Sequence, residues 1–195
     1  MSKGLVHIYY GNGKGKTTAA FGQALRAIGH GYRVAVIQFF KSGGFTGEFL
    51  IAPRLEPHLK IWQFGKKCPY AEEIRKGKKQ CFSCNKCMFN PYDAKDRFRQ
   101  KKIILEAWRR AKEKIFSLEY DLVILDEVNN IIRYNLINSH DVLTVLKEKP
   151  PELEIILTGR SFPQNLIDFA DYVSEIKAVK HPFQKLIKAR RGIEY

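Results

Sequence analysis

A glycine-rich stretch near the N-terminus, residues 11–18, constrains this chain more than any other feature of its sequence. Its letters are GNGKGKTT, and the β-branched and aromatic run 6–10 directly precedes it. Residues 19–28 follow with the apolar spacing of a helix. The order is therefore strand, glycine-rich turn and helix. In that arrangement backbone N–H groups at a helix N-terminus can surround the oxygens of a phosphate.

The residue types in this turn suit the phosphates of a nucleotide. We expect Lys16 to reach the phosphates and the Thr17 hydroxyl to contact Mg²⁺. The usual P-loop pattern has a glycine six residues before its lysine, a position that is Tyr10 here, so the loop is a variant. The strand and helix on either side disfavour the alternative of an incidental turn rich in Gly and Lys. The loop residues predicted to bind the nucleotide are Gly11, Asn12, Gly13, Lys14, Gly15, Lys16, Thr17 and Thr18.

Two acidic residues, Asp126 and Glu127, follow the apolar run 122–125. They are expected at the carboxyl end of a buried strand, which is the edge where open α/β sheets bind ligands. Either carboxylate could hold Mg²⁺, directly or through water, and the alternative is a pair of acids that face solvent. No Ser/His/Asp or Cys/His arrangement is readable in the sequence. The nucleophile is therefore expected to be water or a second substrate.

The rest of the chain alternates between strand and helix patterns. Further strands are predicted at 33–40, 60–64, 122–125, 154–157 and 172–179. Helices are predicted at 96–116, at 139–149 with Ser139 as N-cap, and at 163–170. This alternation predicts one three-layer α/β domain over 1–195, with a mainly parallel sheet and a basic, cysteine-containing insert at about 65–95.

Composition narrows the class of protein and its location. The chain has 195 residues, of which 45% are hydrophobic and 28% charged, as expected of a globular protein. No apolar run is long enough to span a membrane, and residues 1–10 do not have the pattern of a secretory signal. A cytoplasmic protein without a membrane partner is predicted, and its cysteines are expected to be reduced.

Positive charge is concentrated in one part of the chain. The net charge is +14, and residues 66–114 contain 16 basic and 6 acidic side chains. A basic region of this kind can bind nucleic acid, an acidic membrane surface or anionic small molecules. It can also be no more than the solvated face of a helix.

The four cysteines lie in that same region. Their spacing is C-x12-C-x2-C-x2-C, and the first of them precedes a proline. Zinc sites usually pair two C-x2-C units across a longer gap, whereas C-x2-C-x2-C and Cys-Pro are elements of iron–sulfur ligation. The spacing favours a [4Fe–4S] cluster over zinc, with four unliganded thiols as the alternative. The predicted ligands are Cys68, Cys81, Cys84 and Cys87.

In combination, these motifs resemble the P-loop type of ATP:corrinoid adenosyltransferase, the family of cob(I)alamin and cob(I)yrinic acid a,c-diamide adenosyltransferases. The similarity is carried by residues 11–22, 26–31, 36–41, 47–48, 125–127, 158–160, 170–171, 179–183 and 192–195. It extends over nearly the whole chain except about 65–95. In the family, aromatic residues that help displace the lower axial ligand of the corrinoid lie in that region. The aromatic residues that could replace them here are Trp62, Phe64, Tyr70, Phe82 and Phe89.

The resemblance implies a RecA-like P-loop NTPase fold and a homodimer. It also implies a reaction in which cobalt(I) of a corrinoid attacks C5′ of the co-substrate ATP and expels triphosphate, as part of cobalamin biosynthesis or salvage. The catalytic residues would be Lys16, Thr17 and Glu127, with Mg²⁺ as cofactor. Arg26 and Arg160 would join the loop in binding ATP. A reductase is a candidate partner, and nucleic acid is not an expected one.

Two other functions fit parts of the sequence. A P-loop ATPase could use the basic segment to bind nucleic acid, and such binding would be sensitive to salt. A zinc-stabilised interaction module could be carried on a P-loop domain with little turnover.

Overall fold

A single parallel sheet forms the centre of the molecule, for which a computed structural model describes residues 3–81, 84, 86–185 and 187–195. The strand order is β3-β2-β4-β5-β1-β6, and every neighbouring pair in it is parallel. One strand, β5, therefore separates the strand before the glycine-rich loop from the strand that ends in Asp126. The strands are β1 (Val6–Tyr10), β2 (Val34–Phe39), β3 (Leu59–Phe64), β4 (Leu122–Asp126), β5 (Glu154–Gly159) and β6 (Tyr172–Glu175).

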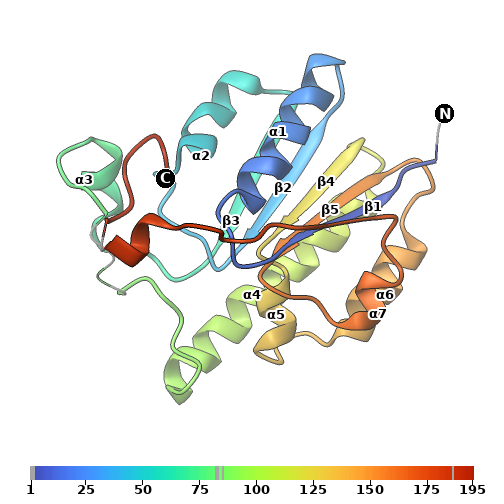
Figure 1. Ribbon diagram of the computed structural model, residues 1–195. Coiled ribbons are helices and arrows are strands. Elements are labelled where there is room, and N and C mark those ends of the chain that lie inside the picture. The colour runs from blue at the N-terminus through green and yellow to red at the C-terminus, as the bar shows by residue number, and fades with distance from the viewer. Residues whose placement is uncertain (1–2, 82–83, 85, 186) are drawn as a thin grey trace.

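Helices cover both faces of this sheet, which gives the expected three-layer α/β fold (Figure 1). One face carries α1 (Lys16–Gly29), α2 (Gly47–Ile51) and the 3-10 turn η1 (Ala52–Leu55). The other carries α4 (Ala94–Phe116), α5 (Asn129–Arg133), α6 (Ser139–Glu148) and α7 (Gln164–Ile167). The short helix α3 (Ala71–Arg75) and the 3-10 turn η2 (Pro182–Lys185) lie in the connecting segments. The architecture is consistent with a P-loop NTPase-like fold.

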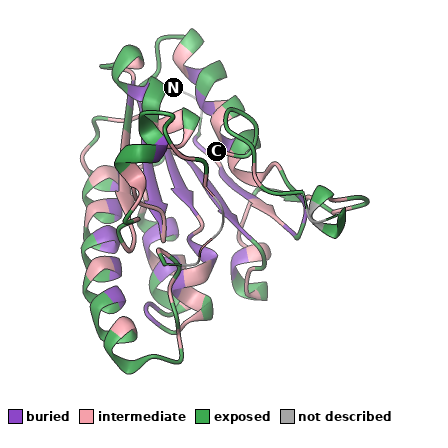
Figure 2. Ribbon diagram, turned by 90° about the vertical axis from the view of Figure 1, so that its left-hand side faces the viewer, coloured by how far each residue is buried: buried purple, intermediate pink, exposed green. Residues whose placement is uncertain are grey.

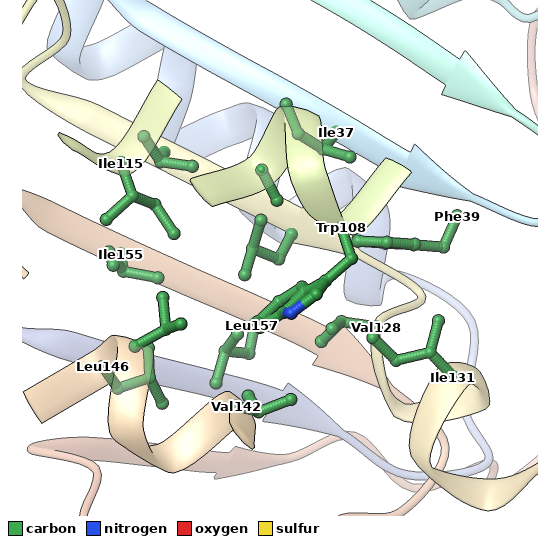
Figure 3. Close-up of a cluster of buried hydrophobic side chains, with 14 of the residues drawn as sticks. Ile37, Phe39, Trp108, Ile115, Val128, Ile131, Val142, Leu146, Ile155 and Leu157 are labelled. Carbon is green, nitrogen blue, oxygen red and sulfur yellow. The ribbon is translucent and has the colours of Figure 1, made fainter. Parts of the chain in front are cut away.

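The core consists of two apolar layers, one on each side of the sheet. Because side chains alternate along a strand, Val123 and Leu125 of β4 pack toward α4, whereas Leu122 and Ile124 pack toward α1. Trp108 of α4 lies in the middle of the larger layer (Figure 3). The four central strands are buried along most of their length, whereas the edge strand β6 is exposed and the edge strand β3 is mostly half-buried (Figure 2). Apolar strand runs in the sequence thus correspond to strands that are covered on both faces.

Several boundaries differ from the sequence-based prediction by one or two residues, and the helix predicted at 163–170 is only Gln164–Ile167. Three further differences have a clear physical reason. Helix α1 begins at Lys16 and not at residue 19, because Gly15 adopts a left-handed conformation (φ 118°) and the helix starts directly after it. The N-cap of α6 is Asn138 and not Ser139, since the Asn138 side chain accepts the N–H of Asp141 at 2.8 Å. Strand β6 ends at Glu175, well before the predicted end at 179, because Ile176 turns toward the glycine-rich loop.

The helices of the described residues can be compared with the length and composition of a membrane-spanning helix. None of them has both the length and the apolar composition that crossing a bilayer requires.

Candidate nucleotide-binding site

The glycine-rich loop connects β1 to α1 at the carboxyl edge of the sheet. Gly15 stands immediately before the helix, so the first N–H groups of α1 are directed toward the space above the loop. Gly13 is held against the segment after β6, since its N–H donates to the Ile176 carbonyl at 2.8 Å. A Cβ atom at Gly13 would come within 2.8 Å of that same oxygen. Close packing, and not only loop flexibility, therefore requires glycine there.

Lys16 reaches back across its own loop. Its Nζ donates to the Gly13 carbonyl at 2.7 Å. Burial lowers the pKa of Lys16, and the negative charge of Glu127 opposes that shift. The ammonium group thus lies in the loop region beside an acidic residue, which is where a phosphate-binding lysine has to be.

Asp126 is fully buried behind the loop and has four hydrogen-bond donors. The Thr17 hydroxyl donates to Oδ1 at 2.8 Å, and the Thr158 hydroxyl to the same atom at 2.6 Å. Gln38 Nε2 and Lys41 Nζ donate to Oδ2 at 2.9 and 2.6 Å. Burial alone would raise the pKa of Asp126, but the Lys41 ammonium and the hydroxyls of Thr158 and Thr17 lower it. The carboxylate is therefore charged and already occupied by protein groups.

Lys41 is the cation that faces both Asp126 and the loop. Its Nζ also lies 3.3 Å from the Thr17 hydroxyl, and 27% of the side chain is exposed. Burial opposes its charge, yet the neighbouring Asp126 raises the pKa of Lys41. A permanent positive charge consequently lies next to Thr17, close to where nucleotide phosphates would bind.

Glu127 adopts a left-handed backbone conformation (φ 62°) that directs it differently from Asp126. Its N–H donates to the Thr158 hydroxyl at 3.0 Å, and its carboxylate accepts Nδ2 of Asn130 at 2.9 Å. Burial, followed by the negative charge of Asp126, raises the pKa of Glu127. A non-glycine residue in this conformation is uncommon, and such residues cluster at functional sites.

A cavity of about 680 Å³ lies above the loop, which is within the size range of small-molecule sites. Its lining combines loop residues with cationic, acidic and aromatic side chains from distant parts of the chain. The lining residues are Asn12, Gly13, Lys14, Gly15, Lys16, Thr17, Thr18, Phe21, Lys41, Thr46, Gly47, Glu48, Glu127, Arg160, His181, Gly192, Ile193, Glu194 and Tyr195.

Most of the predicted nucleotide-binding residues meet at this cavity. Seven of the eight loop residues line it, together with Glu127 and Arg160. Gly11 lies behind the lining, where its N–H donates to the Arg160 carbonyl at 3.2 Å. Arg26 is not part of the lining: it is exposed on α1, with Nη1 3.5 Å from Oε1 of Gln23. Ten residues of helix separate it from Lys16, a distance of about 15 Å along the helix axis.

The residues at the cavity fit Mg²⁺, which prefers hard oxygen ligands. The Thr17 hydroxyl and the Glu127 carboxylate both line it. Asp126 is different, since its oxygens already accept from Thr17, Thr158, Gln38 and Lys41. Within the described ranges, no three His, Cys, Asp or Glu side chains form a preassembled metal site.

Sequence reasoning assigned no role to several residues that complete this site. Gln38 lies at the end of β2 and Lys41 two residues beyond that strand, and the sheet register places Gln38 opposite Asp126. Adjacent carboxyl ends of parallel strands could have identified both residues, once β2 and β4 were known to be neighbours. Thr158 at the end of β5 is a third such residue. Glu194 and Tyr195 could not have been found in this way, because they reach the cavity from the other end of the chain.

The four cysteines and the aromatic candidates lie outside this lining. All four thiols are free and half-buried. Phe89 packs with Phe40 and Tyr134, at ring-centroid distances of 5.6 and 5.0 Å, and Trp62 packs against Tyr120. Phe82 lies outside the described residues.

Comparisons with known proteins show the family to which the chain belongs. Residues 2–195 match the family described as ATP:corrinoid adenosyltransferase BtuR/CobO/CobP. A corrinoid adenosyltransferase of Sinorhizobium sp is 37% identical over 99% of this chain and 81% of its own length. The corrinoid adenosyltransferase of Escherichia coli K12 is 35% identical over 99% of this chain and 86% of its own. The Salmonella typhimurium protein named corrinoid adenosyltransferase CobA is 33% identical over the same shares. The chain therefore belongs to the ATP:corrinoid adenosyltransferase family.

Proposed function

We propose that the cavity binds ATP and that the chain transfers the 5′-deoxyadenosyl group of ATP to cobalt(I) of a corrinoid, with release of triphosphate. Membership in the family supports the reaction. The observation that carries the assignment to this cavity is the meeting of seven loop residues with Lys41, Glu127 and Arg160 around one space. Such a lining suits a polyanionic leaving group.

The chemical task of the protein is then to position two substrates and to stabilise charge. Cobalt(I) is itself the nucleophile, so the enzyme needs no general base to generate one. Holding C5′ in line with cobalt would supply the main advantage of proximity. The amides of the loop, together with Lys14, Lys16 and Lys41, would stabilise the negative charge that develops on triphosphate as the C5′–O bond breaks. Arg160, at the cavity rim, would add a further cation.

Thr17 and Glu127 are the residues proposed to hold Mg²⁺, and Asp126 is proposed to act on it through Thr17 or through water. A bound Mg²⁺ supplies charge neutralisation for the phosphates. Asp126 itself orients the Thr17 hydroxyl, because that hydroxyl donates to it at 2.8 Å. The family resemblance is the sole support for Arg26 as a nucleotide contact, because Arg26 does not line the cavity in this structure.

Other assignments stay proposals. The resemblance supports a homodimeric assembly, and a reductase that supplies electrons for cobalt(I) is a candidate partner. Composition and charge support a cytoplasmic location and a basic insert at about 65–95 within one domain. The cysteine spacing supports a [4Fe–4S] cluster or zinc at Cys68, Cys81, Cys84 and Cys87.

An anaerobic spectroscopic assay tests the proposed function. The protein would be mixed with ATP, Mg²⁺ and a corrinoid reduced to cobalt(I), and the absorption spectrum followed as an alkylcobalt species forms. We expect the spectrum to change only when both ATP and protein are present. An unchanged cobalt(I) spectrum with folded protein would contradict the proposal. ATP hydrolysis stimulated by nucleic acid would instead favour an ATPase that uses the basic segment, a function that the family membership does not favour.

A further inference from the structure

The segment between β3 and α4, residues 65–93, has few buried apolar side chains to stabilise it. Among its described residues, only Ile74 is buried. All four cysteines of the chain lie in this segment, half-buried and without a disulfide. A polar segment of this length needs another source of order, and in small polar units that source is often a metal.

One aromatic ring brings the three cysteine-bearing parts of the segment together. Tyr70 lies two residues after Cys68, and Lys86 Nζ approaches its hydroxyl to 3.1 Å. Lys79 Nζ lies 3.9 Å from the centroid of the same ring. Because Lys79 is two residues before Cys81 and Lys86 directly precedes Cys87, the chain folds back on itself at Tyr70. Two lysines that follow Tyr70 by 9 and 16 positions in the sequence thus meet at its ring.

The four thiols lie in this folded-back part of the chain, and each of them is half-buried and free. They do not form a closed metal site in the described part of the chain. Coordination would therefore draw the thiolates inward, as in sites where metal binding and local folding are coupled.

Basic residues flank the cysteines in the sequence. Thiolates bound to zinc or to an iron–sulfur cluster leave an anionic centre, which nearby cations stabilise. The basic residues next to the cysteines are Lys66, Lys67, Lys78, Lys79 and Lys86. Some of them already have acidic partners, as Lys66 does in Asp96 at 3.2 Å.

The same segment is in contact with the wall of the nucleotide cavity. The N–H of Cys81 donates to the hydroxyl of Tyr195 at 3.1 Å. Tyr195 lines the cavity, and its ring packs edge-on against Phe45 at 5.8 Å. A Cβ at Gly77 would lie 2.3 Å from Nη1 of Arg191, so the chain before Tyr195 also lies against the cysteine segment. The two segments are neighbours beside α3 (Figure 1).

We propose that Cys68, Cys81, Cys84 and Cys87 bind one thiolate-ligated metal centre, and that this centre holds Tyr195 in place at the nucleotide cavity. The metal centre is inferred from the cysteine group alone, whereas the positioning of Tyr195 rests on the proposed function of the cavity. The ligand is of one chemical class, a thiophilic metal, which can be a [4Fe–4S] cluster or a single Zn²⁺. The hydrogen bond from Cys81 to Tyr195 is the link between the metal centre and the cavity.

Metal content of the full-length protein, purified anaerobically, tests the first part. Iron, acid-labile sulfide and zinc would be measured for the wild type, for Cys84→Ser and for Met88→Ser. Met88 is an exposed residue of the same segment and serves as the control. We expect stoichiometric metal in the wild type and Met88→Ser, and its loss in Cys84→Ser. A brown protein with iron and sulfide identifies the cluster, and a colourless protein with zinc identifies the single ion. Absence of metal that added Zn²⁺, or iron with sulfide, fails to restore would overturn the site.

ATP affinity tests the link to the cavity without relying on turnover. Tyr195→Phe removes the hydroxyl that Cys81 contacts and keeps all four thiols, and the exposed Tyr92→Phe is its control. Losing one hydrogen bond should weaken ATP binding about fivefold in Tyr195→Phe, while metal content stays at the wild-type level. Wild-type ATP affinity in Tyr195→Phe would overturn the link, even if the metal site is real. A protein that binds metal normally but does not adenosylate a corrinoid would contradict the proposed adenosyltransferase function and leave the metal site standing.

Discussion

Asp126 and Glu127 are adjacent in sequence but occupy different environments. Asp126 is buried among four donors, whereas Glu127 turns through a left-handed backbone conformation to line the cavity. The sequence predicts two acids at a strand end, because four apolar residues precede them. It cannot assign separate roles to them, since these depend on Lys41 and Thr158, which come from neighbouring strands.

Lys16→Ala tests the role of the loop lysine. Nζ of Lys16 donates to the Gly13 carbonyl within its own loop, so the loss of this side chain should leave folding nearly unchanged. Loss of a cation from the leaving group should lower kcat/KM for adenosylation roughly 10²- to 10³-fold. Steady-state kinetics and thermal unfolding would be measured beside Lys147→Ala, a change on the exposed face of α6. Near-normal turnover in Lys16→Ala would remove the loop from the active site.

Asp126→Asn should act mainly on stability. The change leaves the Lys41 ammonium without its carboxylate in a largely buried position, which should cost about 3 kcal/mol of unfolding free energy. For a chain of this size that corresponds to a fall in Tm of roughly 6–12 °C. Thermal and denaturant unfolding would measure it, with the exposed Asp168→Asn as control. Equal stability of both variants would show that the ion pair contributes little.

Glu127→Gln should act mainly on the metal. The amide keeps the shape of the side chain but removes the charge that Mg²⁺ needs, so activity should fall and be partly restored at high Mg²⁺. Adenosylation rates would be measured over a Mg²⁺ series for the wild type and the variant. Full activity of Glu127→Gln at all Mg²⁺ concentrations would rule out the assigned role.

At the scale of elements, the sequence predicts the buried strands and long helices well. The runs that became β2, β4 and β5 are apolar because both faces of the sheet are covered, and α4 has a regular apolar stripe with Trp108 at its centre. The short helices α2, α3 and α5 were not predicted. Each has only five residues, too few for a helical period to be visible.

The end of β6 shows how tertiary contacts override a local pattern. Residues 172–179 look like one strand, yet the ladder with β1 ends where the N–H of Ile176 donates to the Tyr10 carbonyl. The carbonyl of Ile176 accepts from Gly13 of the loop and not from a strand. The conformations of the loop and of the chain after β6 thus depend on each other. The sequence of neither segment predicts this contact.

Two glycine substitutions test that contact. Gly13→Ala would place a Cβ within 2.8 Å of the Ile176 carbonyl, which forces the loop backbone to move. We expect ATP binding to weaken about tenfold, as for an overpacked contact. Gly22→Ala, in the same helix–loop unit, has no atom within 4 Å of its new Cβ and should raise stability by about 0.5–1 kcal/mol. Calorimetry and thermal unfolding would compare them. Intact ATP affinity in Gly13→Ala would show that the contact is dispensable.

At the scale of the whole molecule, strand order explains why the site is where it is. Because all six strands are parallel, β1, β2, β4 and β5 present their carboxyl ends at one edge of the sheet. The loop, Lys41, the acidic pair and Thr158 are therefore brought together from residues far apart in sequence. Residues 192–195 close the cavity from the other end of the chain.

The position of the bond broken in ATP tests the central claim most directly. Adenosyl transfer breaks the bond between C5′ and oxygen, so the three phosphates leave as one molecule, whereas an ATPase breaks a bond between phosphates. Phosphorus NMR of an anaerobic reaction with ATP, Mg²⁺ and a cobalt(I) corrinoid distinguishes the two. The account predicts one intact triphosphate for each adenosylated corrinoid. Accumulation of ADP and inorganic phosphate, with the corrinoid unaltered, would contradict it.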